Sequence, residues 1–306
     1  MSHQKIHRVK TITEMHRLRG LAPPEHPLIS VIDVESVKID LDKEPETLVF
    51  GFYSIALKRN CSSKFKYGQQ QYDFDEGVMS FIAPNQVLRI EHDPEEILNR
   101  SGWMLFIHPD FLWKYPLSKT IRQYAYFDYS VNEALFLSEK EEETIINIIQ
   151  KIQQEYHANI DKFSQNIIIS YMETLLNYSE RFYERQFLTR KITNHSILDR
   201  LEELLSRYFG DDTQTVKGVP SVQYIADTLN VSPNYLSGLL KVLTGQSTQQ
   251  HIHNKLIEKA KERLSTTELT VSEIAYELGF EYSQSFSKLF KNKTQLSPLE
   301  FRRSFN

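Results

Sequence analysis

Two stretches near the C-terminal end of the sequence place polar side chains between apolar ones at helical spacing. On a helix of 3.6 residues per turn, the apolar residues of each stretch share one face and the polar residues face outward. The outward residues are Asn234, Tyr235, Ser237, Gly238 and Lys241 in the first stretch, and Ser283, Gln284, Ser287, Lys288 and Lys291 in the second. A glutamine such as Gln284 can pair with adenine through two hydrogen bonds, and the ammonium of Lys288 can donate to guanine. This chemistry favours binding to nucleic acid.

These residues belong to a helical pattern that occurs twice between residues 221 and 306. Ile225-Ala226 in the first copy matches Ile274-Ala275 in the second, 49 residues later, and Leu239 matches Leu289, 50 residues later. One residue has therefore been added in the second turn. Each copy predicts two short amphipathic helices joined by a tight turn, which is the helix-turn-helix arrangement. Its second helix would lie in the DNA major groove.

Signals for helix ends agree with this prediction. Ser232 followed by Pro233 suits an N-cap and a first helical position, and Thr270 with Glu273 has the spacing of a capping box. Ser297 with Glu300 has the same spacing. A purely structural helical domain is the alternative for either copy alone, and the matched positions of two copies disfavour it.

The residues of both copies closely resemble the AraC/XylS family of bacterial transcription regulators over about the last 90 residues. The matching positions are Ile225-Ala226, Ser232-Pro233, Tyr235-Leu236-Ser237, Leu239, Lys241, Thr244-Gly245, Ala260-Lys261, Leu264, Ile274-Ala275, Gly279-Phe280, Phe286-Ser287-Lys288, Phe290-Lys291, Ser297-Pro298 and Phe301-Arg302. The sequence departs from the family pattern at Leu240, where Phe is usual, at Leu256, where Arg is frequent, and at Gln295, where Gly is frequent.

The resemblance implies which outward residues would contact DNA. Base-reading positions fall on Asn234, Ser237 and Gly238 in the first copy and on Ser283, Gln284 and Lys288 in the second. Phosphate contacts are expected from Tyr235, Lys241, Ser287 and Lys291. Because glycine has no side chain with which to read a base, we expect the second copy to carry more of the sequence discrimination. The first copy would dock through Lys241 and the neighbouring backbone.

Length and charge are compatible with this expectation. A chain of 306 residues has room for two domains of ordinary size, and its 25% charged and 40% apolar residues are typical of a globular protein. The formal net charge is −4, but residues from Thr215 onward carry 11 Lys and Arg against 8 Asp and Glu. That segment is therefore +3 and the first 214 residues are −7, which places basic charge where DNA binding requires it.

The cellular location is predicted from what the sequence lacks. The single cysteine, Cys61, rules out an internal disulfide framework and suits a reducing compartment. Neither a signal peptide nor an apolar run of the ~20 residues needed to cross a bilayer is recognisable. We expect a cytoplasmic protein with no membrane partner.

The N-terminal part has a different pattern. Residues 1–27 are predicted to form a polar arm, and residues 28–109 contain short aromatic and β-branched runs between turn residues. The predicted strands are 47–57, 70–74, 78–82, 87–90 and 103–107. The resemblance implies a cupin-like β-barrel that binds a small effector. Phe52, Phe65, Tyr67, Phe74 and Phe81 would line a ligand cavity or simply form the core.

Neither a catalytic residue nor a metal or other cofactor is expected, and the protein is predicted not to be an enzyme. A metal-dependent cupin would offer clustered His and Glu ligands, whereas the segment Lys64–Gln70 contains no His-x-His pair. His251 and His253 are two residues apart on a predicted helix and do not share a face.

Residues 109–210 are predicted to be helical and to contain a possible dimer surface. Its residues recur at intervals of 3 and 4, which is coiled-coil spacing. They are Ile168, Tyr171, Leu175, Tyr178 and Phe182. This stripe can pack within the monomer or against a second copy, and we take it as the candidate surface of a homodimer.

The predicted fold class is α+β. An N-terminal cupin-like barrel with a helical hairpin (1–188), β-rich to about residue 109, is followed by a linker helix and linker (189–218) and an all-α domain with two helix-turn-helix units (219–306). The predicted function is sequence-specific transcription regulation, as an activator that responds to a small molecule and contacts double-stranded DNA and RNA polymerase. An architectural DNA-binding protein and an effector-independent regulator remain the alternatives.

Overall fold

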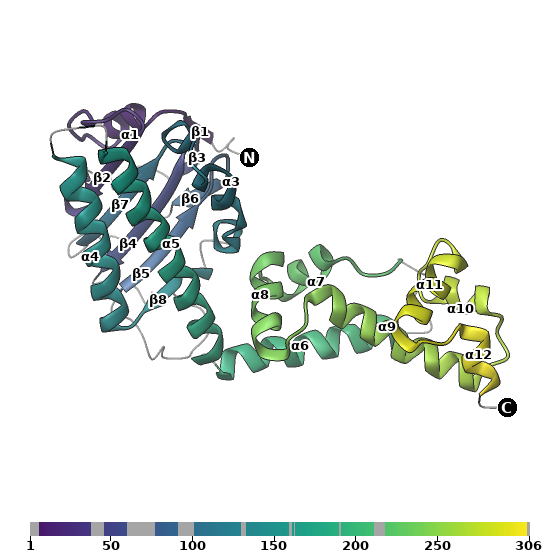
Figure 1. The fold of residues 1–306 in the computed structure, drawn as a ribbon. Helices are drawn as coiled ribbons and strands as arrows, with labels where there is room; N and C mark the ends of the chain where they lie inside the picture. The colour runs from purple at the N-terminus through teal and green to yellow at the C-terminus, as the bar shows by residue number, and fades with distance from the viewer. Residues whose placement is uncertain are drawn as a thin grey trace. The chain divides into compact units, whose positions relative to one another are not determined.

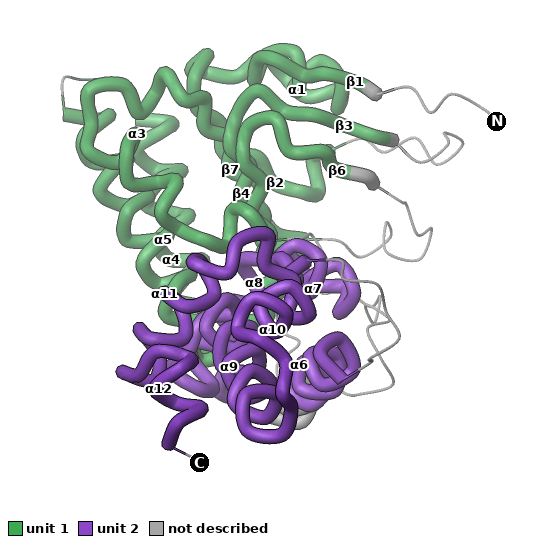
Figure 2. The backbone as a smooth tube through the Cα atoms, turned by 90° about the vertical axis from the view of Figure 1, so that its right-hand side faces the viewer, with its two compact units in different colours: residues 1–186 green, residues 187–306 purple. Residues whose placement is uncertain are grey.

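The computed structural model describes residues 6–37, 46–59, 77–90, 101–129, 133–158, 161, 163–189, 191–210 and 218–304. The chain divides into two compact units, residues 1–186 and 187–306, which are coloured separately in Figure 2. Cys61, the predicted strand 70–74, the segment Lys64–Gln70 and residues 211–217 of the predicted linker region 189–218 lie outside the described residues.

The described strands of the first unit form two sheets. They are β1 (Ile6–Val9), β2 (Ile29–Asp33), β3 (Glu46–Phe50), β4 (Tyr53–Arg59), β5 (Gly77–Ile82), β6 (Val87–Ile90), β7 (Ser101–Ile107) and β8 (Leu135–Leu137). One sheet has the order β1-β3-β6, with β1 parallel to β3, and the other has the antiparallel order β2-β7-β4-β5-β8. These strands do not close into a barrel, so the cupin-like barrel is not confirmed.

One hydrophobic core of this unit lies between the two sheets. Phe50 of β3 stacks on Phe52 with ring centroids 5.2 Å apart, and Phe52 meets the edge of Phe106 of β7 at 5.3 Å. Ile12 and Met15 of helix α1 (Ile12–Leu18) pack against the same cluster. Phe52, which the sequence left open as a cavity residue, is fully buried in this core.

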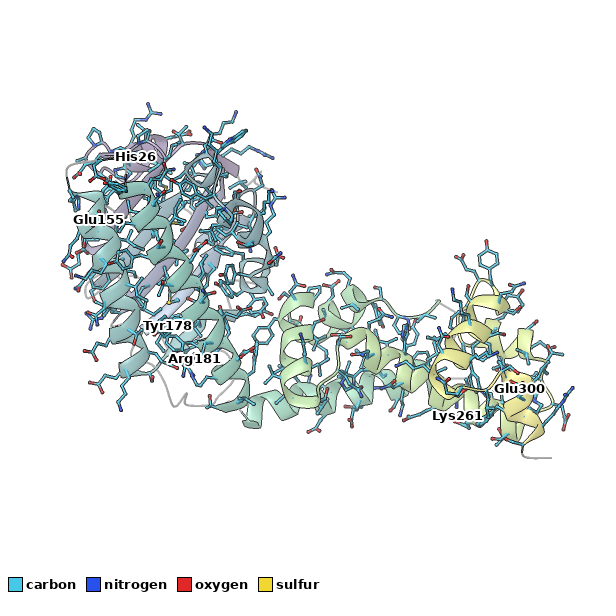
Figure 3. The ribbon with its side chains drawn as sticks, viewed as in Figure 1. His26, Glu155, Tyr178, Arg181, Lys261 and Glu300 are labelled. Carbon is cyan, nitrogen blue, oxygen red and sulfur yellow. The ribbon has the colours of Figure 1, made fainter. Side chains whose placement is uncertain are left out.

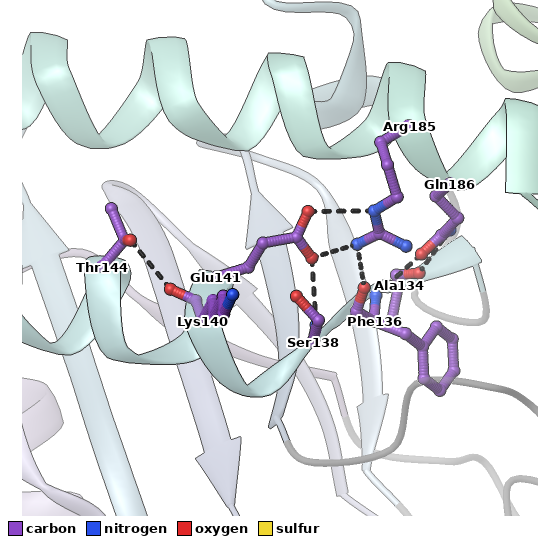
Figure 4. A network of polar contacts seen from close by, with 8 residues as sticks. All are labelled: Ala134, Phe136, Ser138, Lys140, Glu141, Thr144, Arg185 and Gln186. Carbon is purple, nitrogen blue, oxygen red and sulfur yellow. Dashed lines mark hydrogen bonds and ion pairs between the residues drawn. The ribbon is translucent and has the colours of Figure 1, made fainter.

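Helices α4 (Glu139–Tyr156) and α5 (Ser164–Thr189) cover one face of the five-stranded sheet (Figure 1). Strand β4 is therefore buried on both faces from Tyr53 to Leu57. Arg185 of α5 donates to both carboxylate oxygens of Glu141 and to the carbonyl of Phe136 in β8, while Glu141 accepts from the Ser138 amide at the start of α4 (Figure 4). This network fastens both helices to the edge strand. Shorter helices complete the unit: α3 (Leu117–Thr120), η1 (Val34–Ser36), η2 (Pro109–Leu112), η3 (Ile121–Gln123) and η4 (Ala125–Asp128).

One strand prediction needs correction. The run 47–57 is not one strand, because Gly51 and Phe52 separate β3 from β4 and the two strands lie in different sheets. A Cβ on Gly51 would lie 2.9 Å from the carbonyl oxygen of Lys10, so the corner depends on glycine. The segment 1–27, predicted as an arm that packs over the residues after it, contains β1 and α1, and its Val9 is buried in the core.

The candidate dimer surface on α5 is also corrected. Ile168, Leu175 and Phe182 are 5%, 0% and 6% exposed in the single chain, so the monomer itself covers them. Tyr171 and Tyr178 are half-buried, and Tyr178 is labelled in Figure 3. Apolar residues at intervals of 3 and 4 identify the face of a helix that is buried, whatever covers it. Here the rest of the first unit covers it.

The second unit is helical. Its elements are α6 (Lys191–Gly210), α7 (Val222–Leu229), α8 (Pro233–Thr244), α9 (Thr248–Thr266), α10 (Val271–Glu277), α11 (Ser283–Thr294) and α12 (Pro298–Arg303). Helix α9 contacts α6, α8, α10 and α12. Two of its core residues are Leu256 and Ala260, both fully buried. An arginine at position 256 would bury a charge in this core, which explains why a leucine is accommodated there. Among the described helices, none is long and apolar enough to cross a membrane.

Candidate DNA-binding interface

The first helix pair, α7 and α8, is defined by its caps. The Ser221 hydroxyl accepts from the Tyr224 amide at the start of α7, and Asn230 ends that helix with a φ of 58°. Ser232 caps α8 by accepting from the Tyr235 amide, and Gly245 ends α8 with a φ of 72°. The predicted N-cap at Ser232 is confirmed.

The second helix pair, α10 and α11, has the same plan with different ends. Thr270 and Glu273 form the predicted capping box of α10, and hydrogen bonds from Thr270 lower the pKa of the Glu273 carboxyl. Helix α11 begins after Tyr282 without a side-chain cap, and Gln295 ends it with a φ of 64°. The capping box of Ser297 and Glu300 opens α12. Glu300 and Lys261 are labelled in Figure 3.

Helix α8 exposes only some of the residues that were expected to face outward. Asn234 and Lys241 are exposed, whereas Ser237 and Gly238 are half-buried. The Ser237 hydroxyl lies 3.0 Å from the hydroxyl of the buried Thr248 in α9. Ser237 therefore joins α8 to the connecting helix, which reduces its value as a base-reading residue.

Tyr235 does not face outward, and the prediction that it does is wrong. Its side chain is only 8% exposed, and its ring meets the edge of Phe187, the first residue of the second unit, at 5.1 Å. Tyr235 directly precedes Leu236, so the buried face of α8 is wider than a leucine stripe alone would predict.

Helix α11 presents the expected polar face more completely. Gln284, Lys288 and Lys291 are exposed, while Ser283 and Ser287 are half-buried. Phe286 and Phe290 on the opposite side are fully buried. The helix therefore combines an apolar anchor with an amide and two ammonium groups that solvent can reach.

Charge is segregated between the two helices of each pair. The second helices carry only basic charges: Lys241 in α8, and Lys288, Lys291 and Lys293 in α11. The first helices carry only acidic charges: Asp227 in α7, and Glu273 and Glu277 in α10. A polyanion would therefore be attracted to α8 and α11 and repelled by α7 and α10. Counting charge helix by helix would have found this signal in the sequence.

Lys293 is a basic residue that the sequence analysis missed. Its ammonium donates to Asn254 Oδ1 at 3.1 Å, and Asn254 Nδ2 donates to Gln246 Oε1 at 2.8 Å. This chain of hydrogen bonds joins α11, through α9, to Gln246, the second residue after the end of α8. Spacing gives no signal for it, because the three residues belong to three different segments.

The two histidines of α9 make separate contacts. His251 Nε2 lies 2.9 Å from the Thr244 hydroxyl, and His253 Nε2 lies 2.8 Å from Gln249 Nε2. Burial lowers the pKa of both imidazoles, and the Lys293 charge lowers that of His253 further. Across the part of the chain that the structure describes, no group of three or more His, Cys, Asp and Glu side chains is arranged to hold a metal ion.

The second unit is similar to known protein domains. A family model of the helix-turn-helix domain matches residues 225–304, which include both helix pairs. The C-terminal unit contains an AraC-type helix-turn-helix domain. The HTH-type transcriptional regulator YijO of Escherichia coli strain K12 is 34% identical over 82 residues, which are 27% of this chain and 29% of YijO. The chain thus matches less than a third of that relative's length.

Two further proteins are similar to the AraC-type domain or to a longer part of the chain. The HTH-type transcriptional activator RhaS of Escherichia coli O81 is 23% identical over 257 residues, which are 82% of this chain and 85% of RhaS. The C-terminal domain of the two-component response regulator YesN from Fusobacterium nucleatum is 30% identical and covers 34% of this chain and 95% of that chain, with a TM-score of 0.30.

Proposed function

We propose that the protein is a sequence-specific DNA-binding regulator of transcription. The observation that carries the proposal is the matched pair of second helices, α8 and α11, each of which exposes only basic charge. A single AraC-type domain contains both, and α9 contacts both pairs. Lysines neutralise phosphates and supply affinity for any DNA, whereas an amide such as Gln284 discriminates between bases.

The two helix pairs contact DNA in different ways in this proposal. The α11 face, with Gln284, Lys288 and the half-buried Ser283, reads bases, and Lys291 with Ser287 holds phosphates. The α8 face docks through Lys241, and Asn234 is its principal base-reading candidate, because Ser237 is bonded to Thr248 and Gly238 has no side chain. Tyr235 is removed from the set, since it is buried.

Helices α8 and α11 are the two recognition helices of this proposal. Because both belong to one chain, they suit two successive segments of the major groove. Such segments on one face of the duplex are about 34–36 Å apart. One chain then protects two blocks of bases about one helical turn apart, and the site needs no palindrome. DNA that lacks these two blocks of bases is bound through its phosphates alone.

The first unit regulates the activity of the DNA-binding domain in this proposal. It has its own core and its own polar network, separate from the AraC-type domain, as a sensing unit requires. RhaS is named a transcriptional activator, which supports activation as the role of this protein. An activator of this kind would contact RNA polymerase. We assign to the first unit a small-molecule effector and a homodimer contact through a surface other than the buried face of α5.

The test is selection of bound fragments from random DNA by the full-length protein, followed by titration of the selected duplex against a scrambled one. A regulator prefers its site over bulk DNA by about 10³-fold or more. Equal affinity for the two duplexes would overturn the proposal in favour of an architectural DNA-binding protein. A thermal-shift screen of the full-length protein against metabolites tests the effector, because a true ligand raises the melting temperature by mass action.

A further inference from the structure

Helix α6 is fastened to the first helix pair. Arg200 of α6 donates from Nη2 to the carbonyl of Leu229, the last residue of α7, at 3.3 Å. Near the other end of α6, the ring of Tyr208 meets the edge of Tyr224 of α7 with centroids 5.7 Å apart. Two contacts, eight residues apart on α6, thus hold this helix along α7.

The residues that follow are fastened to the second helix pair instead. Phe209 of α6 and Val219 pack against the core that α10 and α11 form together with α9, and this core includes the buried Phe286. Backbone also lies directly on backbone: a Cβ built on Gly279, in the turn between α10 and α11, would lie 2.4 Å from the carbonyl carbon of Gly218. Only a glycine at position 279 permits so close an approach.

The Tyr208 hydroxyl joins these two sets of contacts. It donates to the carbonyl oxygen of Gly218 at 2.8 Å, while its ring lies on Tyr224 of the first pair. Burial and the nearby Tyr224 phenol raise the pKa of Tyr208, which keeps the hydroxyl protonated as a donor. One side chain therefore touches the first helix pair and, through Gly218, the turn of the second.

We propose that Tyr208, Phe209, Val219, Gly279 and the backbone of Gly218 form a brace. This brace sets the separation of the two recognition helices, and so the spacing of the DNA blocks that the protein accepts. The inference rests on the proposed function. A single connecting helix such as α9 leaves the second pair able to twist about that helix. A second tie through different residues removes this freedom. Inserting one base pair moves a block by about 3.4 Å and rotates it by about a tenth of a turn, so a braced protein rejects the altered site.

Two glycines provide a matched pair of variants. Gly279 and Gly218 both have positive φ, +88° and +80°, so alanine strains the backbone at either position. The Cβ of Gly279→Ala would also collide with the Gly218 backbone, whereas that of Gly218→Ala would meet nothing closer than 3.9 Å. Strain is thus common to both variants, and displacement of the brace belongs to Gly279→Ala alone.

Two phenylalanines provide a second pair. Phe209 packs on the second core from α6, and Phe301 packs on the same core from α12, with its ring 5.4 Å from that of Phe290. Phe209→Ala removes the brace contact, while Phe301→Ala weakens the same core without touching the brace. Tyr208→Phe removes only the hydroxyl and keeps the proposal testable if a glycine variant fails to fold.

The experiment measures binding of each full-length variant to the selected duplex with zero, one or two base pairs added or removed between the two blocks. The wild type should lose about tenfold or more in affinity for a one-base-pair change, comparable to a mismatched base. Gly279→Ala and Phe209→Ala should lower that ratio to less than about threefold. Gly218→Ala and Phe301→Ala should bind less tightly at every spacing and keep the wild-type ratio.

The outcomes separate the two proposals. If no sequence is selected, the proposed function fails and the spacing role falls with it. If a site is selected but Gly279→Ala, Phe209→Ala and Tyr208→Phe all keep the wild-type spacing ratio, the brace is overturned and the proposed function stands. A ratio that falls equally in Phe301→Ala would also overturn the brace, because general weakening of the second core would then explain it.

Discussion

The two helix pairs of the AraC-type domain share a plan but differ in what fills it. The first pair buries Leu236, Leu239 and Leu240 on α8, whereas α11 buries Phe286 and Phe290 and leaves Leu289 half-buried. Phe286 and Phe290 thus stand at the positions that Leu236 and Leu240 hold in the first pair. The repeat therefore preserves the position of the apolar face, while the residue types on that face differ between the two copies.

The exposed faces differ more than the buried ones. Helix α8 has one lysine and a glycine at its centre, while α11 has three lysines and an exposed glutamine. Helix α8 also begins with a side-chain cap that α11 lacks. Helix α8 is thus the better-capped helix, and α11 exposes more side chains that can contact DNA. This agrees with the proposal that α8 docks on the DNA and α11 reads the bases.

The largest expected effect comes from the buried face of the second pair. Phe290→Ala should destabilise by about 3–5 kcal/mol, because one ring is removed from contact with Phe286 and Phe301 and a cavity remains. Leu240→Ala in the first pair should cost about 2–5 kcal/mol. Hydrogen exchange should show faster opening of α10 and α11 in the first variant and of α7 and α8 in the second. Uniform acceleration across both pairs in either variant would show that the pairs are not separate cores.

The next effect concerns base reading at matched positions. Gln284 and Asn234 are 50 residues apart, and both are exposed. Gln284→Ala should lower affinity for the selected site by about 1–3 kcal/mol and relax preference at one base position. Asn234→Ala, its matched control, should lower affinity by less than about 1 kcal/mol. An unchanged selected sequence for Gln284→Ala would contradict the assignment of α11 as the reading helix.

The lysines at matched positions should act on all DNA alike. Lys241→Ala and Lys291→Ala remove exposed ammonium groups from α8 and α11. Each should weaken binding to the selected and the scrambled duplex equally and reduce the slope of log affinity against log salt by about 1. Titrations at several salt concentrations measure the slope. A loss confined to the selected duplex would instead make the lysine a base contact.

The helical unit was largely predictable because its signals are local. Both capping boxes depend on residues three apart, and the added residue in the second turn is visible in the change of offset from 49 to 50. The burial of Tyr235 was not predictable, since it depends on Phe187, 48 positions away in the sequence. The same holds for Lys293 and Asn254, which meet across two helices.

The first unit was less predictable because its sheets depend on long-range pairing. The apolar run 47–57 has the composition of one strand, and only the approach of Lys10 to Gly51 explains the corner that divides it. Strands β1 and β2 pair with β3 and β7, which lie far along the chain. The α5 stripe was correctly seen as apolar, and sequence spacing alone does not tell an internal partner from a second copy.

A smaller effect is expected where the two recognition helices end. Gly245 and Gln295 are matched C-caps with φ of 72° and 64°, and a side chain is unfavourable in this conformation. Gln295→Gly should stabilise the second pair by about 0.5–1 kcal/mol. Slower hydrogen exchange in α11 would show it, and Gly245→Gln should speed exchange in α8 by the reciprocal argument. Destabilisation by Gln295→Gly would mean that the bond from Gln295 Nε2 to the Asn292 carbonyl outweighs the strain.

The smallest effect distinguishes the pairs by pH. His251 packs against Thr244 at the end of α8, and the matched position in the second pair is Phe301, which does not titrate. Burial holds the pKa of His251 below its ordinary value of 6.5, with Glu202 acting in the opposite direction. The folded state therefore binds its proton less readily than the unfolded state, and stability falls as the pH drops below about 6.5 until the folded imidazole also protonates. The half-exposed position keeps this loss small.

His251→Gln tests this linkage, since glutamine can still donate to Thr244 and does not titrate. The variant should lose less stability than the wild type between pH 7 and about pH 5, measured as the free energy of unfolding of the first pair by hydrogen exchange. His253→Gln is the control, because it removes a second half-buried imidazole from the same helix, one that lies near the Lys293 charge. If the wild type and His251→Gln lose stability in parallel, His251 is not the group that makes the first pair sensitive to acid.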